Sequence, residues 1–244
     1  MSVSADHCAP AAATPVQPVE SIDVFASFGV RAYITTRAFG SLSTLGDEPV
    51  EDVIGRWDAL RLGVLRARRF ATGRQVHGTR VVTYDGSWSG WLRVDDVDGH
   101  YAPDRGTGLA VTVADCVPVL IAHPSGAIAA VHAGWRGTAA GIMRRALTRI
   151  SEDGYSISEL RVHLGPAICG RCYEVSPDVY GQLTGKSVDR PTTVDLRGLL
   201  AGQACAAGVR AVTVSDDCSR CDTDRFFSHR GGDVGRQAAA IIGD

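Results

Sequence analysis

Three apolar segments follow one another closely between residues 109 and 133, and they constrain the fold more than any other part of the chain. They cover 109–114, 118–123 and 127–133, and Pro124-Ser125-Gly126 supplies a turn between the last two. The first is a continuous apolar run, Leu109 to Ala114, of the kind that is typical of a buried strand. We therefore expect three strands in quick succession here.

Strand and helix patterns alternate along the rest of the chain without a regular βαβ rhythm. We expect strands on either side of Gly29 within 22–36, on either side of His77-Gly78 within 69–84, and at 161–168 and 209–215. We expect helices at 47–62, with Asp47 as cap and Pro49 in the first turn, and at 138–150, 177–183, 195–207 and 233–242. This order predicts one α/β or α+β domain over residues 21–244, with a mixed sheet between helices. Residues 1–20, rich in alanine and proline, are expected to be a disordered tail.

The composition excludes several classes of partner. The formal net charge is −2, which gives no electrostatic reason to expect nucleic acid or an anionic membrane surface. No apolar stretch approaches about 18 residues, so we expect no membrane span. Prolines interrupt the N-terminal segment, which argues against an export signal and favours a cytoplasmic location. In a reducing compartment, seven cysteines favour free thiols and metal ligands over a disulfide framework.

Three short segments each present one side chain that binds transition metals: His77, Cys116 and His132. A catalytic zinc uses three protein ligands and keeps a fourth position open for water or substrate. Cys116 and the acid Asp115 directly follow the buried 109–114 strand, a position that suits chemistry better than packing. The alternative is that each is an ordinary residue of the interior.

Arginines and paired cysteines are the other candidate functional residues. Arg37, Arg136 and Arg230 stand in segments that contain glycine or serine. There a guanidinium can hold a phosphate or carboxylate with two parallel hydrogen bonds, although surface arginines are commoner. Two Cys-x-x-Cys pairs, 169–172 and 218–221, have the pattern of a structural Cys₄ zinc site. They lie far apart in sequence, so unrelated thiols or disulfides are alternatives.

Several common catalytic motifs are missing from the sequence. No Gly-x-Gly-x-x-Gly, Walker loop or Gly-x-Ser-x-Gly segment occurs in a suitable context. None of the seven histidines forms a His-x-His pair, which counts against a true multicopper oxidase. The internal Met143 falls on an apolar helix face and is assigned to the core rather than to a blue-copper site.

Together the motifs resemble the YfiH family, also called the laccase-domain or polyphenol-oxidase-like family. The likeness extends over roughly residues 22–242, and Ala-Asp-Cys-x-Pro and His-Ala-Gly-Trp-Arg-Gly are its most specific segments. In chain order the matching segments are Thr36-Arg37, Gly46-Asp47, Gln75-Val76-His77-Gly78, 112–120, 131–137, 164–168, Tyr173-Glu174-Val175, Asp195-Leu196, Cys218, 226–230 and Gly235-Arg236.

This resemblance implies a metal, usually zinc with copper as the alternative, bound by His77, Cys116 and His132. It implies phosphorolysis of adenosine, inosine or methylthioadenosine and deamination of adenosine, with a purine nucleoside and phosphate as partners. Arg37 and Arg230 would then hold phosphate oxygens. For deamination, zinc would lower the pKa of a water, and Asp115 and His229 are the nearest proton carriers by motif.

Other activities remain open at this point. Family members are also linked to editing of peptidoglycan precursors and, in older descriptions, to phenol oxidation. Without a metal, Cys116 could be a nucleophile with His132 as base, as in a cysteine hydrolase. A metal-stabilised interaction domain without activity is a further alternative. The chain also departs from the family pattern, because residues 38–45 are compressed and Gly231 replaces an arginine.

Overall fold

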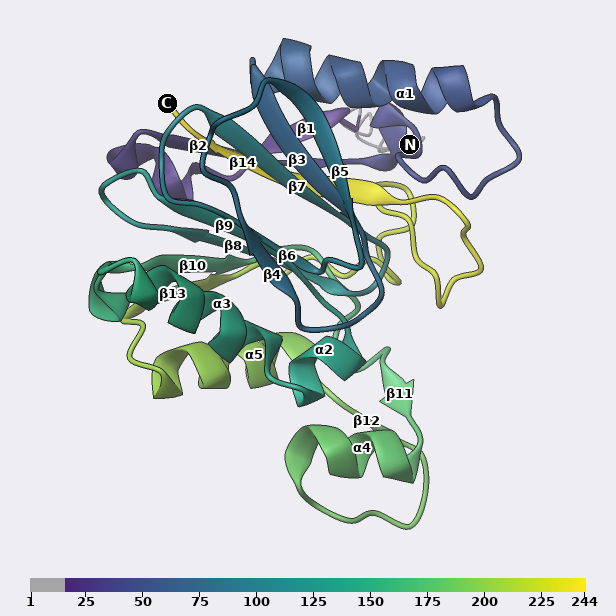
Figure 1. Cartoon of the computed structure of the whole chain (residues 1–244). Helices are drawn as coiled ribbons and strands as arrows, with labels where there is room; N and C mark the ends of the chain where they lie inside the picture. Colours follow the sequence, from purple (N-terminus) through teal and green to yellow (C-terminus); the bar gives the residue numbers. More distant parts are fainter. Residues whose placement is uncertain (1–15) are drawn as a thin grey trace, which may run out of the picture.

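Two six-stranded sheets pack face to face in the computed structural model, which describes residues 16–244 (Figure 1). Both sheets contain parallel and antiparallel neighbours, which confirms the mixed α/β class, with two sheets in place of one. The first sheet has the order β1 (Val19–Ser21), β2 (Val30–Thr35), β14 (Gln237–Gly243), β7 (Thr107–Val113), β3 (Arg69–Arg74), β5 (Gly90–Asp95). The second has the order β13 (Ala211–Val214), β10 (Arg161–Leu164), β8 (Val117–Ala122), β9 (Ile128–Ala133), β6 (Gly99–Ala102), β4 (Val81–Thr83).

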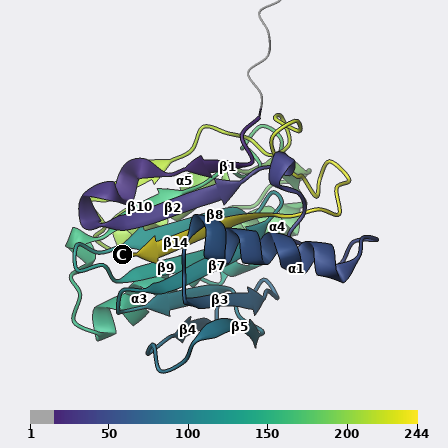
Figure 2. The same cartoon turned by 90° about the horizontal axis from the view of Figure 1, so that it is seen from above.

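Helices cover the outer faces of the two sheets, so the molecule has four layers (Figures 1 and 2). The covering helices are α1 (Val50–Asp58), continued by a π-helical segment (Ala59–Val64), on the first sheet, and α3 (Ile142–Glu152) and α5 (Leu196–Ala206) on the second. Trp57 anchors α1 in the outer core of the first sheet, and Leu200 anchors α5 in that of the second. Aliphatic side chains of both sheets, such as Val111 and Leu120, fill the space between them.

The chain passes from the first sheet to the second at Ala114-Asp115-Cys116. The three strands expected between 109 and 133 are present as β7, β8 and β9, but β7 belongs to the first sheet and the β8–β9 hairpin to the second. Asp115 has a φ of +79°, a left-handed conformation that few non-glycine residues adopt. Because the hairpin pairs Pro118 with His132, Cys116 arrives close to His132.

The prediction of a helix over 233–242 is wrong, because this segment contains β14, which lies between β2 and β7. Its run of alanines has a high helix propensity, which favoured the helix. The strand is buried on both faces, however: Ala239 and Ile241 belong to the core between the sheets, and Ala240 and Ile242 to the core under α1. Burial on both faces and pairing with two strands outweigh the local propensity.

Three expectations about the N-terminal third also need correction. The first strand expected in 22–36 is a 3-10 helix, Asp23–Phe28. Residues 19 and 20 of the expected tail belong to β1, which pairs with β2, and residues 1–15 of that tail lie outside the described residues. α1 begins after Pro49 with no hydrogen bond from a capping side chain, so Asp47 does not cap it.

The remaining predicted elements are present, although one helix is divided at a glycine and four strands were not predicted. The helix expected over 138–150 is divided into α2 (Trp135–Ala139) and α3 at Gly141, whose φ is +83°. β10, α4 (Pro177–Thr184), α5 and β13 lie within or beside their expected ranges, whereas β5, β6 and the short β11 (Glu174–Val175) and β12 (Thr192–Thr193) were not expected. Among residues 16–244, no helix combines the length and apolar character needed to cross a membrane.

Candidate metal centre and cavity

His77, Cys116 and His132 converge on one point although they come from different parts of the chain. His77 lies in the loop between β3 and β4, Cys116 at the crossing between the sheets, and His132 in β9. One potential ligand atom from each of the three lies within 4.8 Å of the others. The two imidazole rings meet edge to face, with their centroids 4.8 Å apart. The structure therefore brings together the three ligands named from the sequence.

Asp98 orients His132 from behind. This carboxylate is completely buried, and its Oδ1 lies 2.8 Å from His132 Nδ1. Nδ1 must donate there, so Nε2 is the ring nitrogen left to face Cys116, an arrangement common for histidines that bind metals. Burial raises the pKa of Asp98, but hydrogen bonds from His132 and from the Gly78 N–H lower it by more. The net pKa therefore lies below its usual value, and the side chain is held as a carboxylate.

The same carboxylate fixes the loop that carries His77. The backbone N–H groups of Val76, His77 and Gly78 all donate to Asp98, at 3.2, 3.0 and 2.8 Å. His77 has a φ of +61°, and these hydrogen bonds hold that uncommon conformation. Gln75 fastens the start of the loop to β7: its Nε2 donates to the Thr112 carbonyl, and its Oε1 accepts the Thr112 N–H.

The electrostatics of the site favour a thiolate at Cys116. Burial raises the pKa of this thiol, but the facing imidazoles of His132 and His77 lower it by more, so the net pKa is about 6. Burial lowers the pKa of His132, whereas Cys116 and Asp98 raise it, to about 9. Gly134 leaves the space for this approach, because a Cβ there would lie 2.9 Å from His77 Cδ2 and 3.0 Å from Cys116 Sγ.

The donor set fits a transition metal. A thiolate and two imidazole nitrogens are ligands that zinc and copper both accept, and three of them leave one position of a tetrahedral zinc site open. The buried carboxylate behind His132 supplies the orienting contact that such ligands usually have. We infer from this geometry that His77, Cys116 and His132 can hold one metal ion.

A cavity of about 610 Å³ opens beside the three ligands, all of which line it. His229, named from the sequence as a proton carrier, also lines it. The compressed 38–45 segment contributes Leu42, Ser43, Thr44 and Leu45 to its wall, so the departure from the family pattern lies next to the metal centre. Three arginines line it as well: Arg236, which belongs to a segment that resembles the family, and Arg74 and Arg93, which the sequence did not single out.

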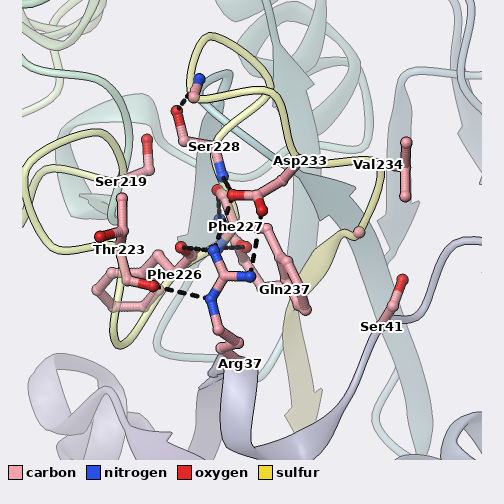
Figure 3. A network of polar contacts seen from close by, with 12 residues as sticks. Arg37, Ser41, Ser219, Thr223, Phe226, Phe227, Ser228, Asp233, Val234 and Gln237 are labelled. Carbon is pink, nitrogen blue, oxygen red and sulfur yellow. Dashed lines mark hydrogen bonds and ion pairs between the residues drawn. The ribbon is translucent and has the colours of Figure 1, made fainter.

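Arg37, in contrast, does not line the cavity, and its guanidinium is already engaged (Figure 3). It donates to both carboxylate oxygens of Asp233, at 3.2 and 2.7 Å, and to the carbonyls of Thr223 and Phe226. It also lies 4.4 Å from the centre of the Phe227 ring. In this position Arg37 fastens the segment that leads to His229 and does not present a free fork to phosphate.

Asp115, Arg136 and Arg230 do not line this cavity, and the Arg230 guanidinium lies 5.2 Å from the centre of the Tyr173 ring. Burial and the charges of Cys116 and Asp115 raise the pKa of Tyr173 to about 12, although the charges of Arg230 and Arg136 act in the other direction. Asp115 accepts the Ser219 hydroxyl and the Arg230 N–H, both at 2.6 Å. Its two oxygens therefore connect the sheet crossing to the C-terminal loops. Arg230 donates to the Glu174 carbonyl, and Arg136 stacks on Trp135.

Sequence reasoning missed Asp98, Arg74 and Arg93 because nothing local distinguishes them. Asp98 is one of several acids in a short stretch, and only the pairing of β6 with β9 brings it beside His132. Arg93 resembles any exposed arginine of an edge strand. Tyr173 belongs to the segment Tyr173-Glu174-Val175, which resembles the family, and that resemblance was the signal that could have identified it.

Known proteins share both the sequence and the fold. A family model described as multi-copper polyphenol oxidoreductase laccase matches residues 39–244. Purine nucleoside phosphorylase ORF3 of Streptomyces griseus is 33% identical over 220 residues, which is 85% of this chain and 89% of that protein. Adenosine deaminase RL5, from an unknown prokaryotic organism, is 31% identical over 83% of this chain and 88% of its own length.

Solved structures agree with these sequence matches. NMB0706 of Neisseria meningitidis has a TM-score of 0.83 at 28% identity, covering 93% of this chain and all of that one. YlmD of Geobacillus stearothermophilus has a TM-score of 0.82 at 29% identity, covering 88% and 93%. Bacillus licheniformis YfiH has the same fold, with a TM-score of 0.86 at 23% identity. Since the family model and the relatives both match most of its length, the chain belongs to the YfiH family of laccase-like proteins.

Proposed function

We propose that this protein is a zinc-dependent purine nucleoside phosphorylase that also deaminates adenosine. The observation that carries the proposal is the convergence of His77, Cys116 and His132 at the wall of a cavity of about 610 Å³. A cavity of that volume can accommodate a nucleoside together with phosphate. The names of the relatives, a phosphorylase and a deaminase, support the same substrate class.

The cavity wall provides different surfaces for the two substrates. Trp57, Trp91 and Leu42 form an apolar, partly aromatic area that suits a purine. Arg93 supplies positive charge for phosphate; Arg236 also lines the cavity, but its Nη1 donates to the carbonyls of Asp233, Val234 and Gly235. Among residues 16–244, the Arg93 side chain has no hydrogen-bond or ion-pair partner, whereas Arg74 is paired with Asp95 and Asp96. We therefore assign phosphate to Arg93 rather than to Arg37.

In the proposed phosphorolysis, a phosphate oxygen forms a bond to C1′ of the ribose while the bond from C1′ to the purine nitrogen breaks. Arg93 holds the phosphate, and the departing base takes up a proton. In deamination, water adds to C6 of the purine and the amino group leaves as ammonia. His229 carries the proton in each case because its side chain lines the cavity beside the ligands. When bound, zinc supplies Lewis acidity and lowers the pKa of a water.

Cysteine hydrolase chemistry is the competing use of the same residues. A Cys116 pKa of about 6 fits a nucleophilic thiolate as well as a metal ligand. The third donor, His77, favours the metal, because a Cys–His pair needs no second imidazole facing the sulfur. With zinc bound, iodoacetamide should modify Cys116 slowly, and a chelator should accelerate the reaction.

A nucleoside panel tests the proposal directly. Purified protein of known zinc content is incubated with adenosine, with and without phosphate, and the products are separated. We expect adenine and ribose 1-phosphate only when phosphate is present, and inosine in both cases. Cys116→Ala should lose the zinc of the His77 centre and both activities, whereas Cys205→Ala, which changes an exposed cysteine on α5, should keep them.

Two results would reject this function. Formation of neither product by zinc-loaded protein would leave the nucleoside reaction without support. Oxidation of a phenol that requires copper and oxygen would assign the metal centre to the oxidase activity named in the family description.

A further inference from the structure

A second group of metal-binding side chains lies outside the cavity. Cys169, Cys172, Cys218 and Cys221 bring their four sulfurs within 4.8 Å of one another, although the two pairs are distant in sequence. Sγ of Cys172 and Sγ of Cys221 are 3.4 Å apart. None of these residues lines the cavity beside His77.

The two Cys-x-x-Cys segments have the same local structure. In the first, the N–H groups of Cys172 and Tyr173 donate to the Cys169 carbonyl, at 2.9 and 3.1 Å. In the second, the N–H groups of Cys221 and Asp222 donate to the Cys218 carbonyl, at 3.1 and 2.9 Å. Each turn therefore presents both of its sulfurs from a tight backbone loop, and the two loops face each other.

Backbone contacts join the two loops in a fixed register. Ala167 and Cys218 form a parallel β-bridge, and the Ser219 N–H donates to the Ala167 carbonyl at 3.2 Å. The Cys169 N–H donates to Cys218 Sγ at 3.2 Å. A backbone N–H directed at a sulfur stabilises its thiolate form, which is the form that binds metal. The sulfurs are thus held together by the fold itself.

We propose that Cys169, Cys172, Cys218 and Cys221 bind one zinc ion as a structural Cys₄ site, separate from the His77 centre. Four thiolates complete a tetrahedral zinc shell and leave no position for substrate. Zn–S bonds of about 2.3 Å place sulfurs about 3.8 Å apart, so the present spacing needs little adjustment. Ligation would release the thiol protons to solvent. The proposal is independent of the nucleoside reaction.

The position of this site gives it a role in holding the catalytic centre together. Tyr173, whose ring centre lies 5.2 Å from the Arg230 guanidinium, directly follows Cys172. Ser219, which donates to Asp115, directly follows Cys218. A metal ion shared by the two turns would therefore fix both of these contacts, as well as the start of the segment that leads to His229. Loss of the ion should loosen this side of the site while leaving the sheets intact.

Elemental analysis of the full-length protein, purified with a thiol reductant, tests the proposal. The readout is the difference in zinc per chain between the wild type and Cys172→Ser/Cys221→Ser. We expect the double variant to contain one zinc fewer, whatever the occupancy of the His77 centre. Cys205→Ser, which changes an exposed cysteine outside both groups, is the matched control and should contain as much zinc as the wild type.

A conservative variant and hydrogen exchange separate ligation from a general loss of structure. The single variant Cys221→His should contain as much zinc as the wild type, because Cys₃His is an established structural ligand set. The single variant Cys221→Ser should contain one zinc fewer. In Cys172→Ser/Cys221→Ser, amide exchange should accelerate in 169–175 and 218–230 and remain slow in β7, β8 and β9.

Two outcomes would overturn the site. One is an unchanged zinc content in a folded double variant. The other is a loss of free thiols, measured in protein denatured without reductant, from the seven that the sequence contains. The second result would assign the four cysteines to disulfides, whose sulfurs lie about 2.05 Å apart when bonded.

Discussion

Asp98 contacts both histidines of the candidate metal centre through a single buried carboxylate. Oδ1 is bonded to the His132 ring and to the His77 N–H, so one side chain fixes a ligand orientation and a loop conformation together. Water is excluded from this carboxylate, which makes each of its contacts costly to lose. At the scale of single residues, the site therefore depends on a group that does not itself bind the metal.

Asp98→Asn should weaken zinc binding by about 10- to 100-fold, because the amide cannot accept all of the hydrogen bonds that the carboxylate accepts. Competition with a chelator of known affinity measures the change. Asp95→Asn, on an exposed side chain of the same stretch, is the control and should bind zinc normally. An unchanged affinity in folded Asp98→Asn would show that His132 needs no orienting partner.

Arg93→Gln should raise the KM for phosphate about ten-fold or more, since a charge-assisted hydrogen bond contributes ~1.5–3 kcal/mol. Adenosine deamination, which uses no phosphate, should change little. Arg68→Gln, an exposed arginine that does not line the cavity, should leave both reactions unaltered. Steady-state kinetics of the two reactions provide the comparison, and an unchanged phosphate KM in Arg93→Gln would place phosphate elsewhere.

At the scale of elements, the C-terminal loops are held by ion pairs rather than by a hydrophobic core of their own. Arg37, just after β2, is paired with Asp233 in the C-terminal loop. Asp233 also accepts a hydrogen bond from the Ser228 N–H at 2.8 Å. Because His229 follows Ser228, these contacts set the position of the proposed proton carrier. Arg37 thus acts on the site through the loop.

Arg37→Ala should lower the free energy of unfolding by ~1–3 kcal/mol, because it removes hydrogen bonds to a charged partner in a half-buried place. Asp233→Ala should do the same, and the double variant should lose less than the sum of the two. Urea denaturation of the four proteins measures this coupling. Additive losses would mean that the two side chains do not act together.

The same ion pair predicts a pH dependence. Hydrogen bonds from Arg37 hold the pKa of Asp233 below its usual value, although partial burial acts in the other direction. A pKa that is lower in the folded state stabilises the protein above the unfolded value, about 3.9, and this contribution is lost at lower pH. The difference in unfolding free energy between wild type and Asp233→Asn should therefore shrink between pH 7 and about pH 3, and a constant difference would contradict this assignment.

At the scale of the whole molecule, β14 joins the two ends of the chain in the middle of the first sheet. It pairs with β2 over 239–243 and with β7 over 237–242, and all of its residues are buried. β7 leads directly into the Asp115–Cys116 crossing. The last strand of the sequence therefore supports the position of a ligand that lies far earlier in the chain.

Truncation after Arg236 should abolish folding, because it removes a central strand and exposes both cores that β14 separates. The near-ultraviolet circular dichroism of any soluble product should lack fixed tertiary signals. Gln182→Ala on α4, a helix without buried residues, is the control and should change stability by less than about 0.5 kcal/mol. A truncated protein with native tertiary signals would show that β14 is dispensable.

The sequence by itself determined the features that depend on residue type and local pattern. The affinity of imidazole and thiolate for metals belongs to the side chains, so His77, Cys116 and His132 could be named before their positions were known. The runs that became β7, β8 and β9 are apolar enough to predict strands without reference to the rest of the fold. The helix face of 142–150 follows from its period in the same way.

Only the tertiary structure decided the features that depend on contacts between distant segments. The alanine-rich 238–240 run forms a strand because two neighbouring strands and two cores surround it, which no local propensity records. Asp98 is hydrogen-bonded to His132, and Arg93 lines the cavity, only because strand pairing places them there. The four cysteines likewise become one cluster because the bridge at Ala167 and Cys218 aligns their two turns. Pairing register is a property of the folded chain, and it turned separate residues into sites.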